Sequence, residues 1–149
     1  MPTLAGWRGR PGPHLQRGRY PAAMPQTLSV VPGEYAVSQL PAGSAAPAWA
    51  FTGDLWCVLG VSDELSVVCP AANVPPGVTT QPGWAALKLH GPFDFTLSGI
   101  LASVLNPLRD AEVGIFALST FNTDYVLVAQ ADLRRAAQAL RAAGHTLLD

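Results

Sequence analysis

Charged residues, cysteines and long apolar runs are all scarce in this sequence. Only 13% of the 149 residues are charged and 49% are hydrophobic, so the chain can build a buried core and is not disordered throughout. No stretch approaches the roughly 20 apolar residues of a membrane-spanning helix. The N-terminus has arginines but no apolar segment after them, which excludes a secretory signal. We therefore expect a cytoplasmic protein with one medium domain or two small ones sharing a core.

The basic residues are unevenly distributed. Four of the nine lie near the N-terminus, at Arg8, Arg10, Arg17 and Arg19, and no acidic residue precedes Glu34. The part from Met24 onward contains the remaining five basic residues and all ten acidic residues, so its formal charge is −5. A nucleic-acid-binding domain normally carries a basic patch, so nucleic acid is excluded as a partner of this part of the chain.

Motifs for catalysis and metal binding are missing too. The histidines His14, His90 and His145 are scattered, and no H-x-x-x-H or C-x-x-C spacing indicates a metal site. There is no G-x-S-x-G turn and no G-x-x-x-x-G-K-S/T phosphate loop. The adjacent acids Asp63 and Glu64 fall in a predicted turn, where they are simply solvated. We expect no catalytic residues, no cofactor and no metal.

The two cysteines, Cys57 and Cys69, lie in strand-like segments. Buried thiols of a cytosolic protein are the more ordinary interpretation. A disulfide across the hairpin stays open as an alternative, because the sequence does not fix the turn length that would place the two cysteines opposite each other.

Residues 1–25 are predicted to be a disordered tail. They contain five prolines, four glycines and four arginines without any periodicity. A basic tail that contacts RNA or a membrane is one interpretation. The one we favour is that translation begins at Met24, so that MPQTLSVV opens the domain.

Residues 26–82 are predicted to form an abbreviated module. A strand is expected over Glu34–Leu40, and Ser44–Trp49 has room for one helical turn. Two short apolar runs, Leu55–Leu59 and Leu65–Cys69, flank a five-residue polar turn and predict a hairpin. A turn or short helix is expected at 73–77.

Residues 83–149 are predicted to form a complete βαββαβ module. Within Leu97–Leu108, apolar residues recur at helical spacing as one stripe: Leu97, Ile100, Leu101, Val104, Leu105 and Leu108. A second helix is expected between its cap at Asp132 and Gly144. The strands are expected at Trp84–His90, Val113–Leu118, Tyr125–Ala129 and His145–Leu148.

An acidic residue precedes an apolar strand in both halves, at SDELSVV and NTDYVLV. We interpret this as an internal duplication. The predicted fold class is therefore α+β, with tandem ferredoxin-like modules over 26–82 and 83–149, the first one abbreviated. A unit of about 60 residues is marginal alone, which favours pairing of the two.

The connection from the predicted strand at 84–90 into the following helix is the first candidate ligand site. Free backbone N–H groups at a helix start attract a carboxylate, aided by the helix dipole. The candidate residues are Asp94, Phe95, Ser98, Gly99 and Ile100. The simpler interpretation is that Thr96 or Ser98 caps the helix and that Phe93 and Phe95 belong to the core.

The polar segment between the strands at 113–118 and 125–129 is the second candidate. Carboxylate and carbonyl oxygens accept from an ammonium group, and hydroxyls donate to a carboxylate. The candidate residues are Ser119, Thr120, Asn122, Thr123 and Asp124. A ferredoxin-like arrangement would bring this turn close to the first candidate site. The alternative is that Asn122 and Asp124 merely form the turn.

Four segments carry a resemblance to a known family: EYAVSQLP, SDELSVVCP, GILASVLNPL and FALSTFNTD. Over about residues 28–147, and most specifically over 98–128, the sequence resembles small bacterial tandem ACT-domain proteins, relatives of the ACT regions of aspartate kinases and of the CASTOR arginine sensors. The resemblance implies modules that pair side by side and bind an amino acid or similar effector at a module interface. It assigns ligand contacts to Asp94–Ile100 and Ser119–Asp124, with Asp124 accepting from a cationic group.

We therefore expect a non-catalytic regulatory protein that binds a small molecule, most simply an amino acid. A structural or protein-interaction module of the same fold that has lost its ligand is the alternative. Ferredoxin-like sheets have open edges that invite pairing with another chain, so a homodimer is expected.

Overall fold

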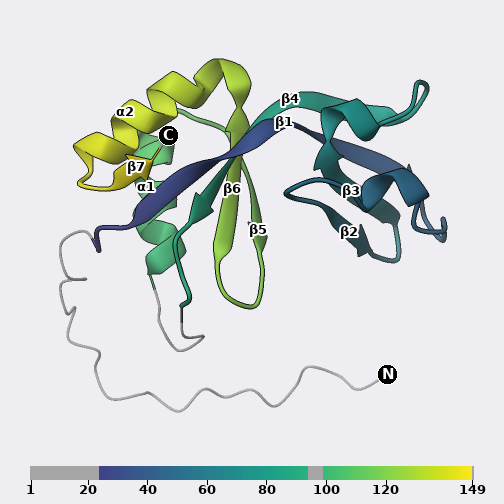
Figure 1. Ribbon diagram of the computed structural model, residues 1–149, viewed down its shortest axis with the longest axis horizontal. Coiled ribbons are helices and arrows are strands. Elements are labelled where there is room, and N and C mark those ends of the chain that lie inside the picture. Colours follow the sequence, from purple (N-terminus) through teal and green to yellow (C-terminus); the bar gives the residue numbers. More distant parts are fainter. Residues whose placement is uncertain (1–23, 94–98, 149) are drawn as a thin grey trace, which may run out of the picture.

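Seven strands form one sheet in the computed structural model, which describes residues 24–93 and 99–148 (Figure 1). The strand order is β2-β3-β1-β4-β6-β5, and β7 pairs with β1. The strands are β1 (Thr27–Pro41), β2 (Cys57–Gly60), β3 (Glu64–Pro70), β4 (Thr79–Leu89), β5 (Ile115–Ser119), β6 (Asp124–Ala129) and β7 (Thr146–Leu148). The helices are α1 (Ile100–Asp110) and α2 (Leu133–Ala142), with 3-10 turns η1 (Ala48–Ala50), η2 (Ala71–Asn73) and η3 (Gln130–Asp132). The predicted α+β, ferredoxin-like fold class is confirmed.

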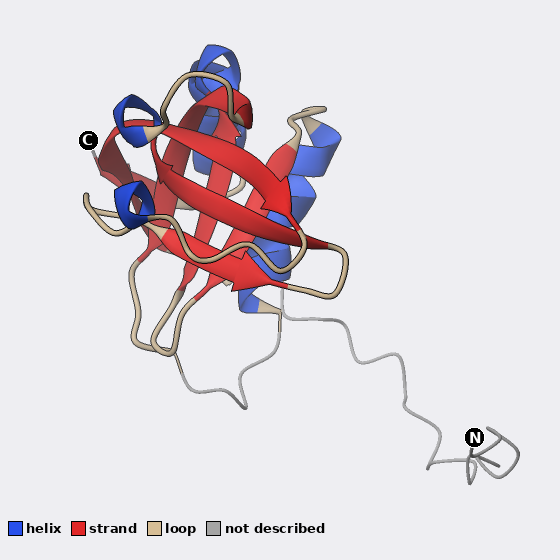
Figure 2. Cartoon of the chain, turned by 90° about the vertical axis from the view of Figure 1, so that its right-hand side faces the viewer, coloured by secondary structure: helices blue, strands red, loops and turns tan. Residues whose placement is uncertain are grey.

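Both α-helices lie on one face of the sheet, behind the strands in Figure 2. The predicted stripe of α1 is buried through Ile100, Val104 and Leu108. It packs against alternate residues of the central strands, such as Leu87 and Val126, because successive side chains of a strand point to opposite faces. The main core of the second half is therefore a layer between the sheet and the two helices.

The two longest strands, β1 and β4, run through both halves of the chain. β4 pairs with both halves of β1 (Leu28 opposite Leu89, Gln39 opposite Thr79), and the second half of β1 also pairs with β3 on its other side (Leu40 opposite Leu65). β1 begins at Thr27 rather than at the predicted Glu34. The reason is that Pro32-Gly33, which looks like a break in the sequence, is absorbed by a register shift within the strand.

β4 contains a similar irregularity. Its Pro82-Gly83 step lies between residues that pair with β1, and Gly83 has φ +84°, a conformation that glycine adopts readily. The expected division between residues 82 and 83 falls at this point, inside a continuous strand.

The first half has the expected short elements. A single 3-10 turn, η1, stands where the sequence has room for one helical turn, and β2 and β3 form the predicted hairpin. Cys57 lies opposite Val68, so the neighbouring Cys69 points to the other face of the sheet. Both thiols are free, and the alternative of a disulfide across the hairpin is wrong.

His145 links the residue before β1 to helix α1. Its side chain is 4% exposed; Nδ1 accepts from the backbone N–H of Gln26 at 2.9 Å, and Nε2 donates to the carbonyl of Ser103 in α1 at 2.8 Å. The adjacent β7 pairs in parallel with the start of β1, which confirms the predicted final strand. No helix among the described residues is long and apolar enough to cross a membrane.

Candidate functional site

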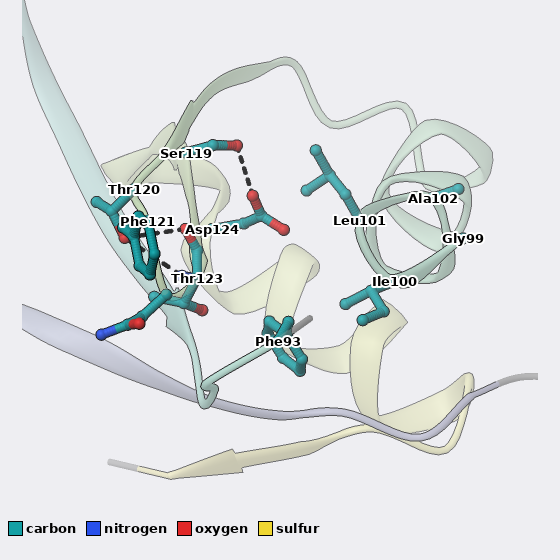
Figure 3. Close-up of a pocket in the computed structure, with 11 residues that line it drawn as sticks. Phe93, Gly99, Ile100, Leu101, Ala102, Ser119, Thr120, Phe121, Thr123 and Asp124 are labelled. Atoms are coloured by element: carbon teal, nitrogen blue, oxygen red, sulfur yellow. Dashed lines mark hydrogen bonds between the residues drawn. The ribbon is translucent and has the colours of Figure 1, made fainter. Parts of the chain in front are cut away.

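A cavity of about 270 Å³ opens between the first turn of α1 and the connection from β5 to β6 (Figure 3). Its lining consists of Phe93, Gly99, Ile100, Leu101, Ala102, Ser119, Thr120, Phe121, Asn122, Thr123 and Asp124. The two segments singled out from the sequence therefore face one another across a single cavity. Three of the predicted site residues, Asp94, Phe95 and Ser98, lie outside the described residues.

The β5–β6 connection is shorter than the sequence suggests. Strand pairing continues to Ser119 opposite Asp124, so only residues 120–123 form the turn. The backbone N–H of Thr120 donates to the carbonyl of Thr123 at 2.8 Å, and the Thr120 hydroxyl accepts from the Thr123 N–H at 3.3 Å. The hydroxyl of Thr120 thus helps to close the turn itself.

Thr123 and Asn122 fasten this turn to the chain that follows β4. The Thr123 hydroxyl, in a side chain that is largely buried, donates to the carbonyl of Leu89 at 2.5 Å. The Asn122 carbonyl accepts from the backbone N–H of Phe93 at 2.9 Å. The backbone of Gly91 lies so close to Asn122 that a Cβ on residue 91 would be 2.6 Å from the Asn122 carbonyl oxygen. These contacts hold one wall of the cavity in place.

Among the described residues that line the cavity, Asp124 is the one that carries a charge. Its side chain is half-buried and reaches from β6 toward the first turn of α1 (Figure 3). The Ser119 hydroxyl donates to Oδ1 at 2.5 Å, and within residues 24–93 and 99–148 the other carboxylate oxygen, Oδ2, makes no hydrogen bond. The carboxylate is thus oriented by one donor and has one oxygen ready to accept from a ligand.

The opposite wall is the start of α1. Its N-cap is Gly99 (φ +82°), and the helix begins at Ile100 rather than at Leu97. A left-handed conformation at this position favours glycine. Thr96 and Ser98, which the sequence offered as caps, lie outside the described residues. Gly99 has no side chain to accept from the N–H groups of the first helical turn, which lack partners within the helix.

Apolar side chains complete the cavity. Phe93 and Leu101 are half-buried, Ile100 is buried, and Phe121 at the turn is 80% exposed. The simpler interpretation of the sequence assigned Phe93 to the core; the resemblance included Phe121 within Ser119–Asp124, and Leu101 and Ala102 were not selected. Leu101 and Ala102 directly follow Ile100, which was selected, and this was the one signal in the sequence that could have identified them.

His90 does not line this cavity. Its ring is exposed and hydrogen-bonds through Nε2 to the Ser29 hydroxyl at 2.9 Å. Among the described residues, no group of three or more histidines, cysteines or acids is placed to hold a metal ion.

Two family models match the chain. The model described as an ACT domain matches residues 79–142, a range that contains every residue lining the cavity. A second model, described as an N-terminal domain, matches residues 33–77. No curated protein matches the chain.

Several solved structures are similar. Protein Atu0741 from Agrobacterium tumefaciens is 41% identical, with a TM-score of 0.81 over 85% of this chain and 94% of that one. An aspartate kinase from Clostridium acetobutylicum is 13% identical, with a TM-score of 0.58 over 78% of this chain and 34% of that one. The regulatory subunit of aspartate kinase from Thermus thermophilus is 11% identical, with a TM-score of 0.54 over 78% of this chain and 93% of that one. At these identities the two kinase structures share the fold alone.

Proposed function

The chain belongs to the ACT-domain family, and from this premise we propose that it is a non-catalytic regulatory protein that binds a free amino acid in the cavity between α1 and the β5–β6 turn. We further propose that residues 83–149 carry the ligand site and that the abbreviated first module, 26–82, supports it through the shared strands β1 and β4.

The observation that carries the proposal is the pairing of opposite chemistries across one cavity. Asp124 offers a carboxylate oxygen on one wall, and the first turn of α1 offers backbone N–H groups and the positive end of the helix dipole on the other. An amino acid has a cationic ammonium and an anionic carboxylate on the same carbon. A zwitterion placed between these walls would meet an acceptor at one end and donors at the other.

The remaining lining supports a small organic ligand. Phe93, Ile100 and Leu101 give the cavity an apolar side against which the rest of an amino acid would pack. The volume of about 270 Å³ is just below the range of about 300–1,000 Å³ typical of drug-sized ligand pockets, which suits a smaller molecule.

The fold neighbours support a regulatory role. The structure from Thermus thermophilus is the regulatory subunit of an aspartate kinase, and this chain matches 93% of its length. We propose by analogy that ligand binding here controls another protein, and that this chain acts as a cytoplasmic homodimer.

A thermal-shift screen of the twenty amino acids on the purified full chain tests the proposal. A ligand present at 100 times its dissociation constant adds about 2.7 kcal/mol to the free energy of unfolding, so one or a few amino acids should raise the melting temperature. No shift with any amino acid at millimolar concentration would contradict the proposal and favour an interaction module that has lost its ligand.

A further inference from the structure

A second cavity, of about 450 Å³, lies between α2, β7 and the start of β1 (Figure 1). It shares no lining residue with the cavity at the start of α1. Its volume falls within the range of about 300–1,000 Å³ that is typical of small-molecule sites. This part of the molecule therefore has room for a ligand of its own.

The apolar part of the lining is aliphatic. Val30 comes from β1, Leu147 from β7, and Leu133 and Ala137 from α2. All four belong to the core between the sheet and the helices or pack against it. No aromatic side chain among the described residues lines this cavity, so it has no ring on which a flat aromatic group could stack. An aliphatic chain fits such a surface.

The charged part of the lining is basic. Four polar residues of the lining recur every three or four positions, which places them along one face of α2 and the turn before it: Gln130, Arg134, Gln138 and Arg141. The Arg141 side chain reaches β7, where Nη2 donates to the Leu147 carbonyl at 3.5 Å. No acidic residue in the described part of the chain lines this cavity. The cavity is therefore suited to an anion.

Arg134 forms no salt bridge within residues 24–93 and 99–148. Arg109 and Arg135, by contrast, are each paired with an aspartate at 2.8 Å. The residues four positions before and after Arg134, on its own face of the helix, are the uncharged Gln130 and Gln138. The guanidinium of Arg134 thus presents planar N–H donors of the kind that match a carboxylate or a phosphate.

We propose that this cavity binds an amphiphilic anion, with a carboxylate or phosphate head at Arg134 and an aliphatic chain along Val30, Leu133 and Leu147. Arg141, about 10 Å further along the helix axis, adds a second positive charge to the cavity. From Met24 onward acidic residues outnumber basic ones, so general charge attraction does not draw an anion to the molecule. The site goes beyond the proposed amino-acid cavity and does not depend on it.

Isothermal titration calorimetry of the full chain with octanoate, butyrate and octanamide tests the site. Each buried methylene group raises the affinity about fourfold, so butyrate should bind at least about tenfold more weakly than octanoate. Octanamide keeps the chain but not the charge, and it should bind at least about fivefold more weakly than octanoate. Octyl phosphate is titrated in parallel, and the tighter of the two anions identifies the preferred head group.

Two variants locate the binding site. Arg134→Gln should weaken octanoate binding about fivefold, the effect expected from the loss of one exposed ion pair. Arg135→Gln is the matched control, because it removes the same charge at the next position of α2 but does not line the cavity. It should bind octanoate as wild type does, and melting curves of both variants check folding.

The proposal would be overturned if neither octanoate nor octyl phosphate bound saturably at millimolar concentration. Equal affinities for octanoate and octanamide would overturn it too, as would equal losses of octanoate affinity in Arg134→Gln and Arg135→Gln. An amino acid found by the thermal-shift screen should stabilise wild type and Arg134→Gln equally. The two ligand proposals therefore succeed or fail separately.

Discussion

Replacing His145 with alanine should destabilise the protein strongly, although this histidine does not line the cavity. The imidazole is 4% exposed and makes hydrogen bonds of 2.9 Å and 2.8 Å to the Gln26 N–H and the Ser103 carbonyl. The substitution leaves both backbone groups without a partner, at about 1–3 kcal/mol for each group that stays away from water. We expect the free energy of unfolding to fall by about 2–4 kcal/mol.

Chemical denaturation and melting curves measure this effect, and His90→Ala is the matched control. For a chain of this size the loss corresponds to a drop in melting temperature of roughly 5–15 °C. His90 is exposed and makes one side-chain hydrogen bond, to the Ser29 hydroxyl, so its replacement should change stability by no more than about 0.5 kcal/mol. If the two substitutions cost the same, the reasoning that His145 holds β1 and α1 together is refuted.

Two further predictions concern Gly91 and the thiols. Gly91→Ala should lower the free energy of unfolding by about 1–3 kcal/mol, because the added Cβ would lie 2.6 Å from the Asn122 carbonyl oxygen. Gly114→Ala is the control, because a Cβ there meets nothing within 4 Å. Equal losses of stability for the two variants in a denaturation titration would contradict the close approach at Gly91. Burial raises the pKa of the Cys57 and Cys69 thiols above their ordinary value of 9.0, so alkylation of the native protein should be slow at pH 8 and fast in denaturant. The stability that this shift contributes is fully present below pH 9.0 and is lost as the pH rises above that value, so the denaturant concentration at the unfolding midpoint should decrease above pH 9.0. Fast alkylation of the native protein at pH 8 would contradict the prediction.

The elements that local patterning specifies were predictable from the sequence. The apolar stripe through Ile100, Val104 and Leu108 predicts α1 because a helix buries one face, and the structure buries these three residues. The β2–β3 hairpin was equally visible as two apolar runs around a polar turn.

The features that depend on distant contacts could not be predicted. β1 continues through Pro32-Gly33 because β4 pairs with it on both sides of that point, which no local pattern encodes. The role of His145 depends on residues 119 and 42 positions away. The N-cap at Gly99 depends on a backbone conformation that the helical periodicity does not contain.

The candidate site lies between these cases. Its two segments were selected from polar residues beside predicted strand and helix ends, and the structure brings their described residues to one cavity. The sequence could not show which of those residues hold the turn in place and which face the cavity. Thr123 is largely buried and hydrogen-bonded to Leu89, whereas Asp124 on the next position keeps a carboxylate oxygen directed at the cavity.

The most direct test of the central claim is a calorimetric titration of the amino acid found by the screen into wild type and Asp124→Asn, with Asp63→Asn as a control for the lost charge. Asparagine keeps the shape and still accepts from the Ser119 hydroxyl, so stability without ligand should barely change. A hydrogen bond to a charged group is worth about 1.5–3 kcal/mol, which predicts that Asp124→Asn binds roughly 10- to 150-fold more weakly, while Asp63→Asn binds as wild type does. Equal affinities for wild type and Asp124→Asn would contradict the claim that this carboxylate receives the ligand.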